Sequence, residues 1–161
     1  MTGPTLDHIS VTVSDLDRSI AFYRDVIGLA LRDRGTADEP ELSDVLATDN
    51  VEIAWAELAL GGVILELVQY LTGGDGPVDV DVKRAGATHI GIAVDDIVPA
   101  VERLRAADAL VSRDVVTLTE DTDWNGAKIV YGRDPDGVTI ELVERAHRIV
   151  VLPDAEAPAE R

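Results

Sequence analysis

Apolar and polar residues alternate along residues 6–13, which is the pattern of a strand with one covered and one open face. The covered face carries Ile9, Val11 and Val13, and the open face carries His8, Ser10 and Thr12. Apolar residues then recur at three- and four-residue spacing, which predicts a helix that Ser14 or Asp15 caps. Gly28 fits the position just past the end of that helix.

Three more strands are expected in the first half of the chain, at residues 29–35, 51–60 and 63–70. Gly61 and Gly62 form the two-residue hairpin turn between the last two of these strands. Residues 36–50 form a long connection with room for one helical turn, and connections of this length often carry function. The first half is therefore predicted to contain a strand, a helix and three further strands.

The same order returns in the second half because the chain contains an internal repeat. Residues 8–16 match residues 89–97, and residues 62–68 match residues 137–143. The second helix is expected to be capped by Asp95 or Asp96, with Pro99 in its first turn. The strands of this half are predicted at residues 87–94, 110–118, 126–133 and 138–144, with an acidic loop at 119–125 and a tight turn at 134–137.

These elements predict an α+β fold of two tandem modules packed into one composite domain, because neither half is large enough for a comfortable core of its own. The first module is expected at residues 5–72 and the second at residues 85–145. Glycine and proline mark residues 73–84 as the linker between them. Residues 146–161 are expected to form a flexible tail with an Ala/Pro/Glu-rich end.

The 161-residue chain is 46% hydrophobic and 28% charged, as soluble globular proteins are. No apolar run reaches about 18 residues, so no association with a membrane is expected. The start of the chain lacks the features of a secretory signal, and without cysteine no disulfide can form, so a cytoplasmic protein is expected. A formal net charge of −17 repels phosphate backbones, so nucleic acid is not expected as a partner.

The repeat places one histidine and one glutamate at corresponding positions of each half. His8 matches His89, and Glu66 matches Glu141. The strand alternation puts all four on the faces that the helices leave open. Two imidazoles and two carboxylates suit a divalent ion of intermediate hardness, such as Zn, Ni, Co, Mn or Fe(II). A lone histidine in a strand is more often a hydrogen-bonded wall residue, but only three histidines exist and two occupy matching positions, which favours one metal site between the modules.

A substrate pocket is expected around this metal. Its predicted lining consists of Ser10, Thr12, Tyr70, Trp124 and Lys128. Trp124 can equally well be an aromatic residue of a surface loop. Tyr70 can equally well be a wall residue at the end of a strand. The expected partner is therefore a small molecule held near the metal.

Several motifs of the chain together resemble the vicinal oxygen chelate superfamily, which includes glyoxalase I, methylmalonyl-CoA epimerase, extradiol dioxygenases and bleomycin- or fosfomycin-resistance proteins. The matching residues in the first half are Leu6-Asp7-His8-Ile9, Val13-Ser14-Asp15-Leu16-Asp17-Arg18-Ser19, Phe22-Tyr23, Gly28-Leu29 and Leu65-Glu66-Leu67. Those in the second half are Thr88-His89-Ile90-Gly91-Ile92-Ala93-Val94-Asp95-Asp96, Asp134-Pro135-Asp136-Gly137 and Ile140-Glu141-Leu142. The resemblance covers about residues 5–145.

This resemblance implies that two βαβββ modules form a cupped, incomplete β-barrel around a metal. It also implies that His8, Glu66, His89 and Glu141 are the metal ligands, as in glyoxalase I. By analogy with the superfamily we expect a homodimer, and the apolar run at residues 149–152 could pack across its interface.

Three functions are compatible with this site. The leading hypothesis is a metal-dependent isomerase, epimerase or lyase that abstracts a proton next to a carbonyl, with Glu66 or Glu141 as the base. The first alternative is an Fe(II)-dependent extradiol-type dioxygenase, which uses two histidines and one carboxylate. The second is a non-catalytic protein that sequesters an antibiotic or metabolite.

Overall fold

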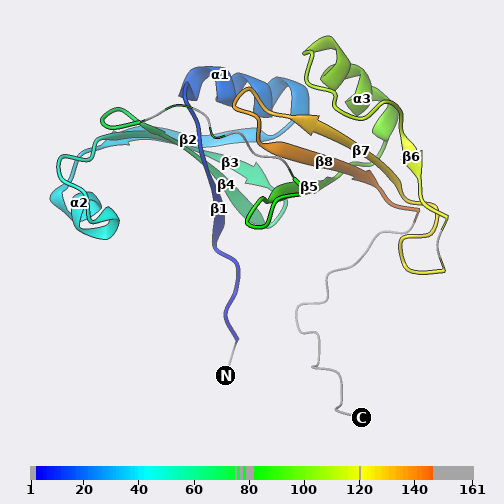
Figure 1. Ribbon diagram of the computed structural model, residues 1–161, viewed down its shortest axis with the longest axis horizontal. Helices are drawn as coiled ribbons and strands as arrows, with labels where there is room; N and C mark the ends of the chain where they lie inside the picture. Colours follow the sequence, from blue (N-terminus) through cyan, green and yellow to red (C-terminus); the bar gives the residue numbers. More distant parts are fainter. Residues whose placement is uncertain (1–2, 75, 77, 79–81, 120, 147–161) are drawn as a thin grey trace.

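The chain forms two four-stranded sheets, each accompanied by a helix from the same half of the sequence (Figure 1). The computed structural model describes residues 3–74, 76, 78, 82–119 and 121–146. The first half contains β1 (His8–Thr12), α1 (Leu16–Ala21), η1 (Phe22–Ile27), β2 (Ala30–Ala37), α2 (Pro40–Leu46), β3 (Ile53–Leu60) and β4 (Val63–Tyr70). The second half contains β5 (His89–Ala93), α3 (Ile97–Ala106), β6 (Val116–Thr117), β7 (Lys128–Arg133) and β8 (Thr139–Glu144).

Both sheets have the same topology. Their strand orders are β1-β4-β3-β2 and β5-β8-β7-β6. In each sheet the first and last strands of the module pair in parallel, and the remaining pairs are antiparallel. The predicted α+β class with two βαβββ modules is confirmed, and neither sheet closes into a barrel. In Figure 1, α1 and α3 lie on the same side of the sheets, so neither helix covers the opposite faces.

The two helices start in the way the sequence predicted. Asp15 caps α1 by accepting a hydrogen bond from the Arg18 amide, and Asp96 caps α3 by accepting one from the Val98 amide. The first helix differs from the expected single α-helix because its second half, η1, is π-helical. It ends at Gly28, which takes a left-handed φ of 97° that favours glycine.

A side chain of the last strand in each module also holds the first amide of the module's helix. Gln69 of β4 accepts a hydrogen bond from the Leu16 amide at 2.9 Å, and Glu144 of β8 accepts one from the Ile97 amide at 2.9 Å. Both amides belong to the first turn, where no partner exists within the helix. The repeat therefore fixes the position of each helix on its sheet in the same way.

The core lies between the helices and the covered faces of the sheets. The residues with almost no exposure include Leu65 and Leu67 on β4, Ile140 and Leu142 on β8, and Tyr23, Ile97 and Leu104 on the helices. One continuous cluster joins both modules, as the small size of each half led us to expect. The strand β8 is buried on both faces, because Thr139, Glu141 and Val143 on its other face are also buried.

Two expectations about the connections need correction. The strand predicted at residues 110–118 is wrong, since only β6 is regular and Leu110 forms a single bridge with Gly132. The amides of Val111 and Ser112 both donate to the carbonyl of Tyr131, which breaks the regular ladder. The connection at residues 36–50 contains the seven-residue helix α2, with Pro40 in its first turn.

Parts of the linker and the tail fall outside the described residues. Of the predicted linker at residues 73–84, positions 75, 77 and 79–81 are not described. Of the predicted tail, only residue 146 is described, so the run at residues 149–152 is not. Across the part of the chain that is described, no helix has the length and apolar character needed to cross a membrane.

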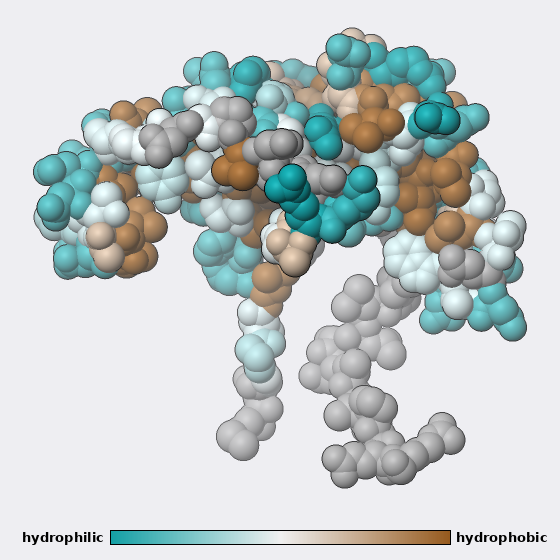
Figure 2. Space-filling view, in the orientation of Figure 1, coloured by the Kyte–Doolittle hydropathy of each residue, from teal (hydrophilic) through white to brown (hydrophobic). Residues whose placement is uncertain are grey.

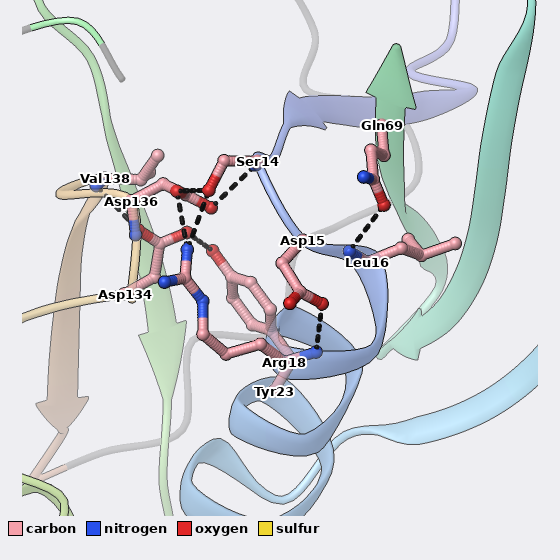
Figure 3. A network of polar contacts seen from close by, with 9 residues as sticks. All are labelled: Ser14, Asp15, Leu16, Arg18, Tyr23, Gln69, Asp134, Asp136 and Val138. Atoms are coloured by element: carbon pink, nitrogen blue, oxygen red, sulfur yellow. Dashed lines mark hydrogen bonds and ion pairs between the residues drawn. The ribbon is translucent and has the colours of Figure 1, made fainter. Parts of the chain in front are cut away.

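A polar junction connects the start of the first helix with the turn between β7 and β8 (Figure 3). The carboxylate of Asp136 accepts hydrogen bonds from the Ser14 amide, the Ser14 hydroxyl and the Arg18 guanidinium. The phenol of the fully buried Tyr23 donates to the buried carboxylate of Asp134 at 3.0 Å. These bonds join residues more than 100 positions apart in the sequence, so they help to hold the two modules in one arrangement.

Replacement of Asp136 by asparagine should lower stability in a pH-dependent way. Burial raises the pKa of Asp136, but the Ser14 and Arg18 hydrogen bonds outweigh it and hold the pKa below its usual 3.8. Stability from this group is present above pH 3.8 and is lost as the pH falls through the lowered folded-state pKa. Urea unfolding should therefore show a wild-type advantage at about pH 7 that shrinks at about pH 3. An exposed control, Asp38→Asn, should show no such change, and an equal advantage at both pH values would contradict the junction's role.

Candidate metal centre

The first candidate pair of metal ligands, the N-terminal pair, consists of His8 on β1 and Glu66 on β4. In the parallel pairing of these strands Ser10 lies opposite Glu66, so His8 sits two positions earlier on the same open face. Its Nε2 lies 3.8 Å from Oε2 of Glu66, and both side chains are accessible, at 47% and 31% of full exposure. The N-terminal pair therefore presents one imidazole nitrogen and one carboxylate to the open side of the sheet.

The neighbouring Asp7 orients the ring of His8. Its carboxylate lies 2.8 Å from Nδ1 of His8. This hydrogen bond is the main reason why the pKa of His8 is raised above 6.5; burial lowers the pKa, and the negative charge of Glu66 raises it. Histidines that bind metals usually give their other ring N–H to such an acceptor. Nδ1 is thus engaged, and Nε2 is left to face Glu66.

The second candidate pair, the C-terminal pair, consists of His89 on β5 and Glu141 on β8. Nε2 of His89 lies 3.1 Å from Oε2 of Glu141, whose side chain retains only 11% of its exposure. The ring of Tyr131 stands edge-on to that of His89, with 5.8 Å between the ring centres. Burial, followed by the charge of Glu141, raises the pKa of Tyr131. A methyl group at Gly91 would lie 3.6 Å from Oε2 of Glu141, so this carboxylate packs beside the backbone of β5.

The two pairs have the same register but do not form one cluster. Gly91 lies opposite Glu141 as Ser10 lies opposite Glu66, so histidine and glutamate are offset by two positions in both sheets. No group of three or more metal-ligating side chains occurs within the described ranges, which include all four of these residues. The structure thus brings the predicted ligands together two by two, and the set of four stays a prediction.

The chemistry of each pair fits half of a divalent-metal site. Each pair offers an imidazole nitrogen beside a carboxylate oxygen, which are ligand types that Zn, Ni, Co, Mn and Fe(II) accept. Two such pairs would supply four ligands and leave two positions of an octahedral ion for water or substrate. A complete site therefore requires that an N-terminal pair meets a C-terminal pair.

Three of the predicted pocket residues lie on the same open face as the N-terminal pair. Ser10 and Thr12 follow His8 on β1 with exposed side chains, and Tyr70 ends β4. Thr12 and Tyr70 line two neighbouring cavities of about 260 and 410 Å³. The structure therefore gathers these two residues at one end of the open face.

Trp124 and Lys128 lie elsewhere in the second module. The guanidinium of Arg145 stacks on Trp124, 3.5 Å from its ring centre. Lys128 pairs with Glu144 across the β7–β8 ladder and binds its carboxylate at 2.5 Å. Lys128 and Glu144 lie on the helix-covered face of the sheet and Glu141 lies on the other face, and the substrate contacts of Trp124 and Lys128 stay predictions.

Sequence reasoning missed two residues that shape the pairs. Asp7 precedes His8 directly, and its carboxylate next to a candidate ligand is a signal that the sequence does contain. Tyr131 shares the open face with Ile129 by strand alternation, but its contact with His89 depends on the pairing of three strands. Such a contact becomes visible only once the order of the strands is known.

Comparison with known proteins identifies the family. The model of the Glyoxalase/Bleomycin resistance protein/Dioxygenase superfamily matches residues 5–142. The chain belongs to this superfamily. The match includes both candidate pairs and most of both modules, and it confirms the resemblance seen in the sequence motifs.

The chain is also similar to curated members of this superfamily. It is 34% identical to a lactoylglutathione lyase of Haemophilus influenzae over 85% of this chain and 90% of that protein. It is 31% identical to a probable lactoylglutathione lyase of Vibrio parahaemolyticus, over 89% of this chain and 93% of that protein. A lactoylglutathione lyase of Arabidopsis thaliana is 30% identical over 86% of this chain, which spans only 43% of that relative's length.

Solved structures of the superfamily share the fold. A glyoxalase family protein from Bacillus cereus aligns with a TM-score of 0.72 and 25% identity, covering 91% of this chain and 99% of that one. A trypanothione-dependent glyoxalase I of Leishmania major aligns with a TM-score of 0.60 and 26% identity, over 88% of this chain and 87% of that one. Together the comparisons support a metal-dependent lyase or isomerase of the vicinal oxygen chelate type, acting with a divalent ion on a small molecule.

Proposed function

We propose that this protein is a lyase or isomerase that moves a proton on the carbon next to a carbonyl group of a small oxygenated substrate. The observation that carries this proposal is the repeated placement of one histidine and one glutamate at the same register in both sheets. The curated relatives named lactoylglutathione lyase support it, because a lactoyl thioester is the isomer of a hemithioacetal and forms by such a proton shift.

The pairs provide the groups that this reaction needs. When bound, a divalent ion supplies Lewis-acid stabilisation to the enolate oxygen as negative charge develops. A carboxylate on the open face takes the proton from carbon and returns it to the neighbouring carbon. The two candidates for this role are Glu66 and Glu141.

We assign the proton transfer to Glu66 and metal binding more firmly to Glu141. Glu66 lies 3.8 Å from its histidine and is 31% exposed, whereas Glu141 lies 3.1 Å from its histidine and is 11% exposed. The looser carboxylate can turn towards a substrate without opening the structure around it. The buried one is held in place and is suited to remain a ligand.

We further propose that the protein is a homodimer in which the N-terminal pair of one chain meets the C-terminal pair of the other. The geometry of the described chain supports this arrangement, because it contains two separate pairs and no group of three ligating residues. A two-fold axis repeats every contact, so one such contact generates two complete sites. The dimer would thus supply to each site the four ligands that the sequence predicted.

We propose that the metal is Zn, Ni, Co, Mn or Fe(II), all of which accept two nitrogens and two oxygens. Elemental analysis of the untreated protein distinguishes these ions. A metal-free preparation would favour the sequestering protein considered from the sequence, and oxygen uptake with a catechol would favour the dioxygenase. The cytoplasm, expected from the composition, is the location that we propose.

Proton exchange tests the proposed reaction. In deuterated water, the metal-loaded protein should convert hemithioacetals of methylglyoxal, made with glutathione and with 2-mercaptoethanol, into lactoyl thioesters that carry deuterium at C2. Glu66→Gln should lower the rate by about 100-fold or more while keeping bound metal, and Glu141→Gln should lose metal. The matched control Glu102→Gln, on the exposed surface of α3, should behave like the wild type. Thioester formation with unchanged rate in both site variants would contradict the assignment.

Complementation between chains tests the shared site. His8→Ala and His89→Ala proteins should each lose metal and activity as homodimers. In a mixed dimer one site lacks both histidines and the other lacks neither, so about half of the wild-type metal content and activity should return. If each site belonged to a single chain, both sites of the mixed dimer would lack one ligand, and no activity would return.

A further inference from the structure

The open face of the first sheet ends in a hollow of defined chemistry. Two cavities of about 260 and 410 Å³ meet there and share Thr12, Tyr70 and Gly74 in their linings. The larger cavity extends to Leu46 at the end of α2. Figure 2 shows hydrophobic surface at this outer end of the molecule, where Val45 and Leu46 are exposed. We call the two cavities together the end cavity.

The end cavity lies on the same face as the N-terminal pair. Thr12 is four positions after His8 on β1, and Tyr70 is four positions after Glu66 on β4. At the rise of a strand, this spacing places the cavity about 13 Å from the pair. A substrate whose reacting carbon lies at the pair can therefore extend its remaining part into the end cavity.

Hydroxyl groups and carboxylates provide the polar lining of this cavity. The polar residues of the larger part are Thr12, Thr48, Asp49, Tyr70 and Thr72, beside the apolar Leu46 and Val51. Three of these groups are available, because the side chains of Thr12, Tyr70 and Asp49 form no hydrogen bond or ion pair with any residue that the structure describes. No lysine or arginine is among the described residues of the lining.

Such a lining disfavours anions and suits hydroxyl groups. Asp49 places negative charge in the larger part of the end cavity, within a chain whose net charge is −17, whereas Asp136 in the smaller part is paired with Arg18. A carboxylate in the larger part of the cavity would meet the like charge of Asp49, for which no lysine or arginine among the described lining residues compensates. Sugar hydroxyls can instead donate to the carboxylate of Asp49 and exchange hydrogen bonds with Thr12, while the apolar face of a pyranose covers the ring of Tyr70.

We propose that the end cavity binds a polyhydroxylated group of the substrate that carries no negative charge, of the sugar or polyol class. This inference rests on the proposed function for the position of the reacting carbon, but the binding itself needs neither metal nor turnover. It assigns the cavity a role in specificity, with Tyr70 as the stacking surface and Asp49 as the group that selects against anions.

Titration of the full-length protein with three matched pyranosides tests this proposal. The probes are methyl α-D-glucopyranoside, its 6-carboxylate and its 2-ammonium analogue, followed by ligand-observed NMR. They share one ring and differ in charge. The neutral probe should bind about tenfold more tightly than the carboxylate. Strongest binding of the carboxylate probe would overturn the proposal, as would no binding of any of the three, whereas the charge of Asp49 should let the ammonium probe bind at least as tightly as the neutral one.

Variants locate the binding. Tyr70→Ala should weaken binding of the neutral probe about fivefold, and Tyr70→Phe should weaken it less because the aromatic ring remains. Asp49→Asn should reduce the difference in affinity between the neutral and carboxylate probes. Asp38→Asn, which makes the same change of charge outside the cavity, should leave that difference unchanged. Equal effects of Asp49→Asn and Asp38→Asn would show that only overall charge matters and would overturn the assignment. Absence of proton exchange together with pyranoside binding would refute the proposed function but not the proposal that the end cavity binds a sugar or polyol group.

Discussion

In each half of the chain, parallel pairing of the module's first and last strands fixes where its histidine and glutamate lie. The covered faces of β4 and β8 carry leucine and isoleucine with almost no exposure, so a shift of one position would bury the candidate ligands and expose the core. The burial of apolar side chains under α1 and α3 thus determines the direction of the four ligating groups. The candidate site depends on this register more than on any single polar contact.

The arrangement of the two modules depends on a different kind of contact. Tyr23 and Asp134 form a buried hydrogen bond, and Asp136 collects donors from Ser14 and Arg18. Burial raises the pKa of Asp134, which shows that placing this carboxylate inside the protein has a cost. The partners of the two aspartates offset that cost and give the junction a defined geometry. This junction keeps the end of β1, and with it Thr12, next to the second module.

The sequence was sufficient for the modules and for the direction of the candidate ligands. Alternation along β1 and β5 and the repeat of Glu66 as Glu141 required only local pattern and the comparison of two halves. The strand expected at residues 110–118 failed because two amides share one carbonyl of Tyr131, which no local pattern reveals. The ion pair of Lys128 with Glu144 likewise depends on the register between β7 and β8, which no local pattern reveals. That the four ligands form two pairs is a property of tertiary structure alone.

The two pairs, the open faces and the superfamily match lead to one account, in which two chains share each metal ion. The most direct measurement is the position of the ion in crystals of the metal-loaded protein, found by anomalous scattering at the absorption edge of the bound metal. The account predicts that each ion is bound by His8 and Glu66 of one chain and by His89 and Glu141 of a second. An ion bound by all four residues of a single chain, or by other residues altogether, would contradict it.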